Sequence, residues 1–582
     1  MNLLNKYWKL AVSLLYGLAA FLFWWLVRPA MLSYHEQYQL FQADNTYIGQ
    51  LLSVPDGVAR CISEYLTQTF INQAVGALIV AVVLVLVQRL TWRVMLVIKQ
   101  QHAAIHYALS FLPSLVLWLT MGDESVLMTF AIAIVAGVLT MWLYELTAQR
   151  FRIAFIIVAL PVLYWAAGPV VLMTTGYIAL RLLGGGSKLK GIASVLLVMA
   201  YSIGLVVASG AVLPHPLQRL FQGIDYYRFS EVYFQMPALV MLLGAVTPFA
   251  ACWQPTAKCR RQVAMGLAEA VVLAVIFLLL MPTFYDARKY EVMEYDFLVR
   301  CNRWDDIISK AEHKTPDLPM TVCATNLALG MKGELGNRAF EFYQNGMQGL
   351  LPAFERNFST LQLTGEAYWQ LGLVNTAQRY AFESMEAIPN YAKSCRVVKR
   401  LAETNLVNGQ YEVSRKYLKM LEKTMAYRKW ARRTLALLGN EQQIAAHPVY
   451  GKLRQLRLTD DFLFSDVEID KMFGQLLMHN PQNPLAMQYL LLSPLLERDV
   501  EKFMSYMAYV GKIQPAYRPR ICQEAVALVY AQQNRQLPAG YVSHQTMSGF
   551  SEFARIFSQA GKQSPELLRF RNTVWYYLMV GD

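Results

Sequence analysis

Long apolar segments, repeated through the first half of the chain, constrain its fold more than any other feature. Nine of them precede residue 285, at about 10–27, 75–91, 104–121, 125–144, 153–167, 169–183, 191–213, 237–253 and 265–283. A helix needs roughly 20 apolar residues to cross the core of a bilayer, so we interpret these segments as transmembrane helices. After Asp286, charged residues occur at ordinary density. The sequence therefore predicts an all-α protein, with a transmembrane bundle over 1–284 and a soluble α-solenoid over 285–582.

The segments at 153–167 and 169–183 are short and meet at Gly168-Pro169. Their lengths suit either one tilted helix or a helical hairpin. Basic residues flank the pair on both sides, at Arg150, Arg152, Arg181, Lys188 and Lys190. Because basic residues favour the cytoplasmic side, both flanks should be cytoplasmic. That arrangement requires an even number of crossings and predicts the hairpin.

The distribution of Lys and Arg predicts the orientation of the whole bundle. With the N-terminus inside, thirteen basic residues fall in cytoplasmic segments and only four in external loops, namely Arg28, Arg60, Arg219 and Arg228. This bias follows the positive-inside rule. Nine crossings then place the C-terminal domain outside the cytoplasm, which in a bacterium means the periplasmic side of the inner membrane.

Two external loops are long, at 28–73 and 214–236. In the first loop, apolar residues recur every three or four positions on both sides of a Pro55-Asp56-Gly57 break. This spacing predicts amphipathic helices, and their many aromatic residues suit the headgroup region of a bilayer. The same helices could instead simply pack on the bundle.

The formal charge of +13 is shared almost evenly between the two halves of the chain. Such a basic balance is compatible with nucleic acid binding, but no nucleic-acid motif accompanies it. We therefore expect membrane lipids as partners and exclude nucleic acid. The seven cysteines form no CxxC pair, which argues against a zinc site.

The C-terminal half contains degenerate helix-turn-helix units. The clearest unit holds Gly365, Tyr368, Ala377, Ser384 and Pro389, at offsets that match a tetratricopeptide repeat. Stacked repeats of this kind present a concave face that binds a protein or peptide. A basic stretch between Arg415 and Arg433 could dock on an anionic partner or lipid, or could be an ordinary solvated helix face.

Acidic residues in two external loops are the candidates for chemistry. Glu36 lies just after the first apolar segment, and Asp123-Glu124 fills the short loop between the third and fourth. Carboxylates at this surface could hold Mg²⁺ or Mn²⁺ against a lipid-linked phosphate, or one of them could act as a general base. Hydrophilic turns use such residues for solubility as well.

Together these acids form a layout that resembles the C-type membrane glycosyltransferases, which use polyprenyl-phosphate sugars. The resemblance covers residues 1–284. It implies catalytic roles for Glu36, Asp123 and Glu124, and places Arg219, Tyr226 and Arg228 in a loop that binds the lipid phosphate. Glu36 stands where that family usually has Asp, and Asp123-Glu124 lacks the spacing of a DxD motif.

Nearly the whole chain also resembles an uncharacterised bacterial membrane family with a repeat-rich tail. Tyr38-Gln39-Leu40-Phe41, Ser53-Val54-Pro55-Asp56-Gly57 and Thr67-Gln68-Thr69-Phe70 carry this resemblance, which implies no activity. Our leading hypothesis is a glycosyltransferase-like protein that uses a polyprenyl-linked sugar. The alternative is an envelope scaffold whose repeat domain recruits protein partners.

Overall fold

The structure is a computed structural model that describes most of the chain. The described residues are 2–99, 104–184, 188–228, 235–253, 262–388, 392–459, 464–465, 467–538 and 540–581. Within these ranges the chain forms helices and no β-strand, apart from one isolated antiparallel bridge between Val126 and Tyr227. The prediction of an all-α protein is confirmed.

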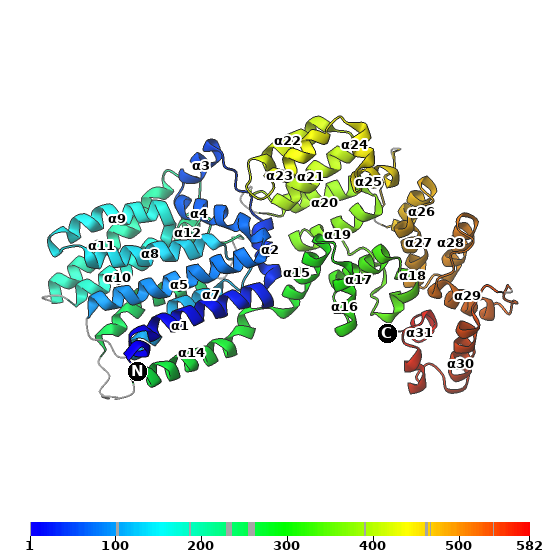
Figure 1. Ribbon diagram of the computed structural model, residues 1–582, viewed down its shortest axis with the longest axis horizontal. Helices are drawn as coiled ribbons and strands as arrows, with labels where there is room; N and C mark the ends of the chain where they lie inside the picture. The colour runs from blue at the N-terminus through cyan, green and yellow to red at the C-terminus, as the bar shows by residue number, and fades with distance from the viewer. Residues whose placement is uncertain are drawn as a thin grey trace. The chain divides into compact units, whose positions relative to one another are not determined.

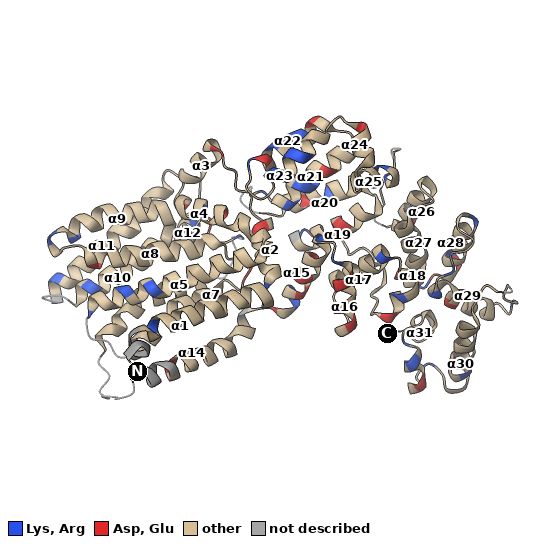
Figure 2. Ribbon diagram, viewed as in Figure 1, with Lys and Arg blue, Asp and Glu red and all other residues tan. Residues whose placement is uncertain are grey.

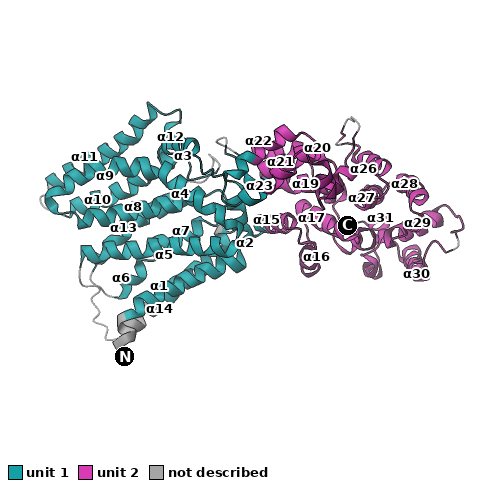
Figure 3. Ribbon diagram, turned by 45° about the horizontal axis from the view of Figure 1, so that its top comes forward, with its two compact units in different colours: residues 1–290, 388–396, 419–431 teal, residues 291–387, 397–418, 432–582 magenta. Residues whose placement is uncertain are grey.

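The chain forms two compact units, coloured separately in Figure 3. The first unit comprises Met1–Tyr290 together with two segments from the C-terminal half, Ile388–Arg396 and Lys419–Ala431. We call these two segments the inserted segments. The second unit comprises Glu291–Ala387, Val397–Leu418 and Arg432–Asp582.

Long helices that lie side by side make up most of the first unit (Figure 1). Its helices are α1 (Asn2–Leu22), α2 (Pro29–Gln37), α3 (Asn45–Leu52), α4 (Gly57–Thr67), α5 (Gln73–Ile98), α6 (Ala104–Leu109), α7 (Leu112–Thr120), α8 (Met128–Leu146), α9 (Arg152–Ala167), α10 (Val171–Leu183), α11 (Lys188–Gly210), α12 (Leu217–Gln222), α13 (Gln235–Val246), α14 (Gln262–Phe284) and the start of α15 (Ala287–Arg300). A π-helical turn, Phe23–Val27, extends α1.

Several of these helices could cross a membrane. Six stretches among the described residues are long and apolar enough, namely Tyr7–Val27, Gln73–Ile98, Met128–Leu146, Gln149–Leu183, Leu189–Gly210 and Gln235–Cys252. A seventh is counted if the bent pair Ala268–Thr283 and Ala287–Arg300 forms one span, and Ala104–Thr120 is apolar but shorter. Figure 2 shows these helices uncharged along most of their length. The predicted cytoplasmic residues Lys258, Arg260 and Arg261 lie outside the described residues.

The stretch Gln149–Leu183 does not run as one straight helix. Arg152 at its start and Arg181 at its end both form ion pairs with Glu145 of α8, at 3.4 and 3.0 Å. An uninterrupted helix would separate these two arginines by roughly 40 Å, which one carboxylate could not bridge. The chain therefore folds back between α9 and α10, at Gly168, whose φ is +70°.

The first long loop, at 28–73, forms α2, α3 and α4, as its periodicity predicted. Helix α4 packs against α8 and α9 through one face. Its other face exposes Val58, Ile62 and Tyr65, which are 40–49% accessible. An amphipathic helix with one packed face and one exposed apolar face is suited to the surface of a bilayer.

The inserted segments bind the chain that follows α2. The Sγ of Cys395 donates to the carbonyl of Gln39 over 2.7 Å, and the hydroxyl of Ser394 donates to the carbonyl of Gln37. Lys423 forms a 2.8 Å ion pair with Asp44. Parts of the chain more than 350 residues apart in sequence therefore build one wall of the first unit.

The second unit is a succession of helices joined by turns and by some longer loops. They include the rest of α15, α16 (Trp304–His313), α17 (Pro319–Lys332), α18 (Leu335–Arg338), α19 (Phe358–Leu371), α20 (Val374–Glu386), most of α21 (Cys395–Val407) and α22 (Tyr411–Glu422), the end of α23 (Arg428–Leu437), α24 (Glu441–Ala446), α25 (Tyr450–Leu456), α26 (Ile469–His479), α27 (Pro484–Leu496), α28 (Val500–Ile513), α29 (Arg520–Gln532), α30 (His544–Ala560) and α31 (Val574–Met579).

The helix pair predicted from the clearest repeat is α19 and α20. A Cβ added at Gly365 would lie 3.3 Å from the Cβ of Tyr380, and the rings of Tyr368 and Tyr380 are 5.0 Å apart. The small residue therefore allows the two helices to approach closely, as expected. Pro389, the last member of that pattern, lies outside the described residues.

Candidate functional site

Two loops predicted to share the external surface lie side by side in the first unit. The backbone N–H of Leu127 donates to Tyr226 over 2.9 Å, and the N–H of Arg228 donates to Ser125 over 2.7 Å. These bonds flank the bridge between Val126 and Tyr227. The acidic loop between α7 and α8 is thus joined to the loop that carries Tyr226 and Arg228.

The three predicted catalytic acids are held by neighbouring residues. Glu36 is 2% exposed and accepts a 2.9 Å hydrogen bond from the hydroxyl of Tyr427. Asp123 accepts from the backbone N–H of Ser125 over 2.8 Å, and Glu124 pairs with Lys289. None of the three lines the cavity described below, so their catalytic role stays a prediction.

The three residues predicted to bind phosphate have different surroundings. The Tyr226 hydroxyl donates to the carbonyl of Ala167 and accepts from the N–H of Val170, so it holds the turn between α9 and α10. Arg219 donates to the carbonyl of Ile224 over 3.3 Å. Of these three residues, only Arg228 lines the cavity.

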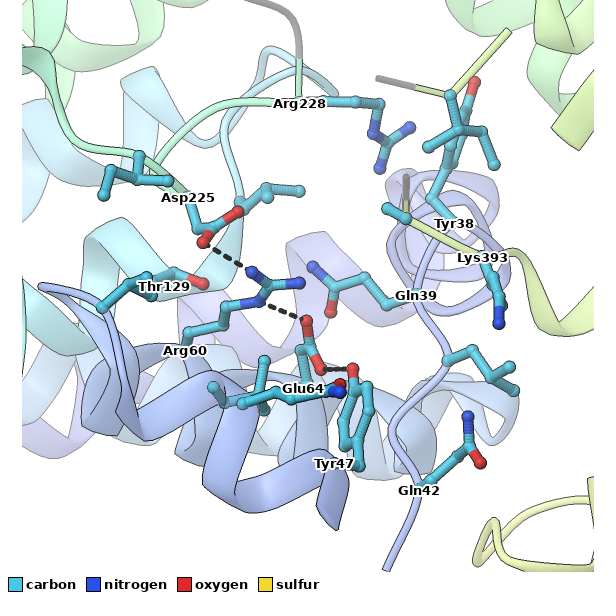
Figure 4. A pocket seen from close by; sticks show the side chains of 18 of the residues that line it. Tyr38, Gln39, Gln42, Tyr47, Arg60, Glu64, Thr129, Asp225, Arg228 and Lys393 are labelled. Atoms are coloured by element: carbon cyan, nitrogen blue, oxygen red, sulfur yellow. Dashed lines mark hydrogen bonds and ion pairs between the residues drawn. The ribbon is translucent and has the colours of Figure 1, made fainter. Parts of the chain in front are cut away.

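The cavity has a volume of about 630 Å³ (Figure 4). Its walls come from α3 and the chain on both sides of it, and from α4. The loop that contains Asp225 and Arg228 and the first inserted segment, at Lys393, also contribute. Apolar side chains also line the cavity, among them Leu51, Val54 and Ile224. The lining therefore combines polar and apolar side chains.

Arg228 supplies a buried positive charge to the cavity. Its side chain is 4% exposed, and its guanidinium carbon lies 3.0 Å from the ring centre of Tyr38. Apart from this contact with Tyr38, its three guanidinium nitrogens have no hydrogen-bond partner among the described residues. Burial lowers the pKa of Arg228, but an arginine stays charged at neutral pH. A buried guanidinium with open donors favours an anionic ligand.

Asp123, Glu124 and His35 lie within electrostatic range of Arg228. Burial, followed by the charge of Arg228, lowers the pKa of His35 to about 3. His35 is therefore neutral near pH 7. The predicted acidic loop, which holds Asp123 and Glu124, therefore lies near the same arginine as His35, the neighbour of Glu36 in the sequence.

A second arginine organises the opposite wall of the cavity. Arg60 of α4 donates to Glu64 over 2.8 Å and to Asp225 over 2.6 Å, and the Tyr47 hydroxyl donates to Glu64 over 2.5 Å (Figure 4). Burial alone would lower the pKa of Arg60, but the two carboxylates raise it overall. Burial and the charge of Glu64 raise the pKa of Tyr47. These groups give the wall both donors and acceptors.

The residues of this second wall were not predicted from the sequence as a site. Arg60 and Glu64 stand one helical turn apart, which is a common surface pair, and Asp225 is 165 residues from Arg60. In the sequence, Arg60 and Glu64 are simply two charged residues of an amphipathic helix, which does not by itself indicate a site. Their partner across the loop could not be inferred without the fold.

A divalent metal ion does not fit the predicted acids. Among the residues that the structure describes, no group of three or more His, Cys, Asp or Glu side chains is placed to bind a metal. Glu124 is neutralised by Lys289, and Asp123 caps its own turn. We therefore derive no step through Mg²⁺ or Mn²⁺.

Comparison with known proteins identifies a family for this chain but no activity. No curated protein and no solved structure matches the chain. The model of one family, described as a family of unknown function, matches residues 6–581. This match covers both units, the cavity and the inserted segments, in agreement with the predicted resemblance of nearly the whole chain to an uncharacterised family. The chain therefore belongs to the family of unknown function DUF6057.

Proposed function

We propose that this protein is a glycosyltransferase-like membrane protein that takes a sugar from a polyprenyl-phosphate donor in the cavity of the first unit. The observation that carries the proposal is the buried guanidinium of Arg228, which lines a cavity of about 630 Å³ and, apart from its contact with Tyr38, has no hydrogen-bond partner among the described residues. A phosphate is the anion that a guanidinium recognises with several hydrogen bonds.

The other walls suit the sugar and the lipid of such a donor. Arg60, Glu64 and Tyr47 offer donors and acceptors of the kind that bind hydroxyl groups. The apolar side chains of Leu51, Val54 and Ile224 in the lining offer a surface for the first units of a polyprenyl chain. A ligand with a charged centre, a polar head and an apolar tail would use all three features.

The proposed topology has nine crossings, with the N-terminus in the cytoplasm of a bacterium. The six candidate stretches support it if α9 and α10 count separately, as their shared partner Glu145 favours, and if Ala104–Thr120 and α14 also span. The cavity then lies at the periplasmic surface, where polyprenyl-phosphate sugars could enter from the bilayer. On the same proposal, the second unit is periplasmic.

A binding experiment tests the phosphate site directly. Purified full-length protein is heated in detergent with a short-chain polyprenyl phosphate, or with the corresponding polyprenol. The phosphate should stabilise the wild type by about 2–3 kcal/mol at a hundredfold excess over its dissociation constant. The polyprenol should have little effect.

Arg228→Gln should abolish this stabilisation, whereas Arg219→Gln is the matched control. Both arginines lie in the same loop and were predicted to bind phosphate, but only Arg228 lines the cavity. Equal responses of the two variants, or equal stabilisation by the phosphate and the polyprenol, would refute the proposed site. The binding of polyprenyl phosphate should be measured before sugar transfer is assayed.

The second unit favours a second candidate function, a scaffold that binds protein or peptide partners through tetratricopeptide-like repeats. The α19–α20 region exposes Phe354 and Phe382, at 39% and 41%, and solvent-exposed aromatics are typical of binding faces. Replacing both with Ser should abolish a scaffold function in a complementation assay. The same change should leave the binding of polyprenyl phosphate unaltered.

A further inference from the structure

Asp56 is the most unusual buried acid of the first unit. It precedes α4 in Pro55-Asp56-Gly57, has a φ of +66° and is fully buried. A left-handed backbone at a residue other than Gly costs about 1 kcal/mol. The neighbouring Gly57 is required, because a Cβ there would lie 2.1 Å from the carbonyl oxygen of Leu51. The fold therefore maintains this acid in a strained and enclosed position.

The carboxyl group of Asp56 lies directly behind the cavity wall. Its Oδ2 accepts a 3.1 Å hydrogen bond from the backbone N–H of Asp225, a residue that lines the cavity. Its Oδ1 is buried and accepts no hydrogen bond of ordinary geometry among the described residues, although the backbone of Ile224 also acts on the carboxyl group. Gly168 packs against it, since a Cβ added there would lie 3.0 Å from the Cβ of Asp56.

The carboxyl groups around Asp56 outnumber the positive charges that could neutralise them. Asp56, Glu64 and Asp225 share one cation, Arg60, which donates to Glu64 and Asp225. Two further titratable groups interact electrostatically with Asp56, namely Tyr164 of α9 and Tyr226. Burial, followed by the charge of Asp225, raises the pKa of Asp56 well above its usual range. An unpaired carboxylate is costly in such surroundings and takes up a proton instead.

We infer that Asp56 and Asp225 form a carboxyl pair that holds one proton at neutral pH and serves as the proton-accepting site of the cavity. Asp56 carries the proton behind the wall. Asp225, paired with Arg60, lines the cavity and serves as the proton acceptor. The natural ligand of this site is the hydroxyl group of an acceptor molecule.

The chemical step rests on the proposed sugar transfer. As the acceptor oxygen forms its bond to the anomeric carbon, the bond from that carbon to the phosphate oxygen breaks. The polyprenyl phosphate leaves with the bonding electrons, towards Arg228. The hydroxyl proton of the acceptor passes to Asp225, so the pair then holds two protons. Because Asp56 is already neutral, it does not add a second negative charge beside the base.

Infrared spectroscopy of the full-length protein tests the pair without any substrate. The difference spectrum between the wild type and Asp56→Asn at pH 7 should show loss of one protonated-carboxyl C=O band. Asn tolerates the left-handed backbone, so the fold should persist. Asp123→Asn, at an exposed acid of a neighbouring loop, is the matched control and should leave that band in place. An unchanged band in Asp56→Asn would overturn the inference.

A second measurement separates this inference from the proposed function. Asp225→Asn should retain stabilisation by polyprenyl phosphate, which depends on Arg228, and should lower sugar transfer about 10²–10⁴-fold. If the wild type binds no polyprenyl phosphate although the band is lost in Asp56→Asn, the carboxyl pair stands and the proposed function fails. If Asp225→Asn transfers sugar at the wild-type rate, its role as the base is wrong.

Discussion

Single residues with unusual backbone or burial mark the candidate site. Asp56 and Gly168 both have positive φ angles, at +66° and +70°, and they touch each other although 112 positions apart. Each belongs to a turn between two helices, Asp56 between α3 and α4 and Gly168 between α9 and α10. The packing of these two turns decides how Asp56 is enclosed.

Gly168→Ala should therefore destabilise the protein more than a helix substitution normally does. The new Cβ would lie 3.0 Å from Asp56 and 3.3 Å from the Tyr226 hydroxyl, in a backbone conformation unfavourable for Ala. We expect a loss of about 1–3 kcal/mol, measured by thermal unfolding in detergent. Gly49→Ala in α3 is the control, because nothing lies within 4 Å of its Cβ position. Equal stability of both variants would contradict this account.

His35 provides a prediction of pH dependence at the same scale. Its pKa is about 3 in the folded protein and 6.5 for a free side chain, so the unfolded chain binds more protons between these pH values. The free energy of unfolding should therefore fall as the pH drops below 6.5, by about 2 kcal/mol at pH 5.

His35→Gln cannot take up this proton and should lose less stability between pH 7 and pH 5 than the wild type. The measurement is the unfolding temperature of the full-length protein at both pH values. His215→Gln, at a partly exposed histidine of the cavity, is the control and should behave as the wild type. A wild-type pH response in His35→Gln would show that another group is responsible.

At the scale of elements, the inserted segments connect α2 to the distant part of the chain. The second inserted segment carries Tyr427, which donates to Glu36, and the first contributes Lys393 to the cavity wall. Deletion of residues 286–582 would remove both segments and open the cavity. Such a deletion therefore cannot distinguish an enzyme in the first unit from a scaffold in the second.

A double-mutant cycle measures the connection between Glu36 and Tyr427. A buried hydrogen bond to a carboxylate contributes about 1.5–3 kcal/mol, so Glu36→Gln and Tyr427→Phe should be non-additive by about 1 kcal/mol or more in thermal unfolding. Glu36→Gln combined with Tyr65→Phe, at an exposed tyrosine of α4, should be additive. Additivity in the first pair would mean that this bond adds nothing to the packing of α2.

For the whole molecule, topology is the property with the widest consequences. A reporter that is active only in the periplasm should be active when fused after Asp582 and silent when fused within the loop after α10. This expectation rests on the basic residues that flank α9 and α10 in the sequence. An inactive reporter after Asp582 would place the second unit in the cytoplasm, and the proposed outer-surface chemistry would fail with it.

The sequence alone was sufficient for the helical class, for several long apolar helices and for the helices of the loop at 28–73. These features depend on local composition and on periods of 3.6 residues, which neighbouring residues determine. The close approach of α19 and α20 at Gly365 was predictable for the same reason, because these two helices are neighbours in the sequence.

The site could be predicted only in part. Arg228 was identified from its loop, and that loop does adjoin Asp123 and Glu124. Arg60, Asp225 and the carboxyl of Asp56 became a group only through tertiary contacts that cross 165–169 positions. Likewise, Tyr427 and Lys393 joined the first unit through hydrogen bonds and packing over more than 350 positions. Local sequence patterns carry no information about contacts at such separations, so only the tertiary structure decided which charges are buried together.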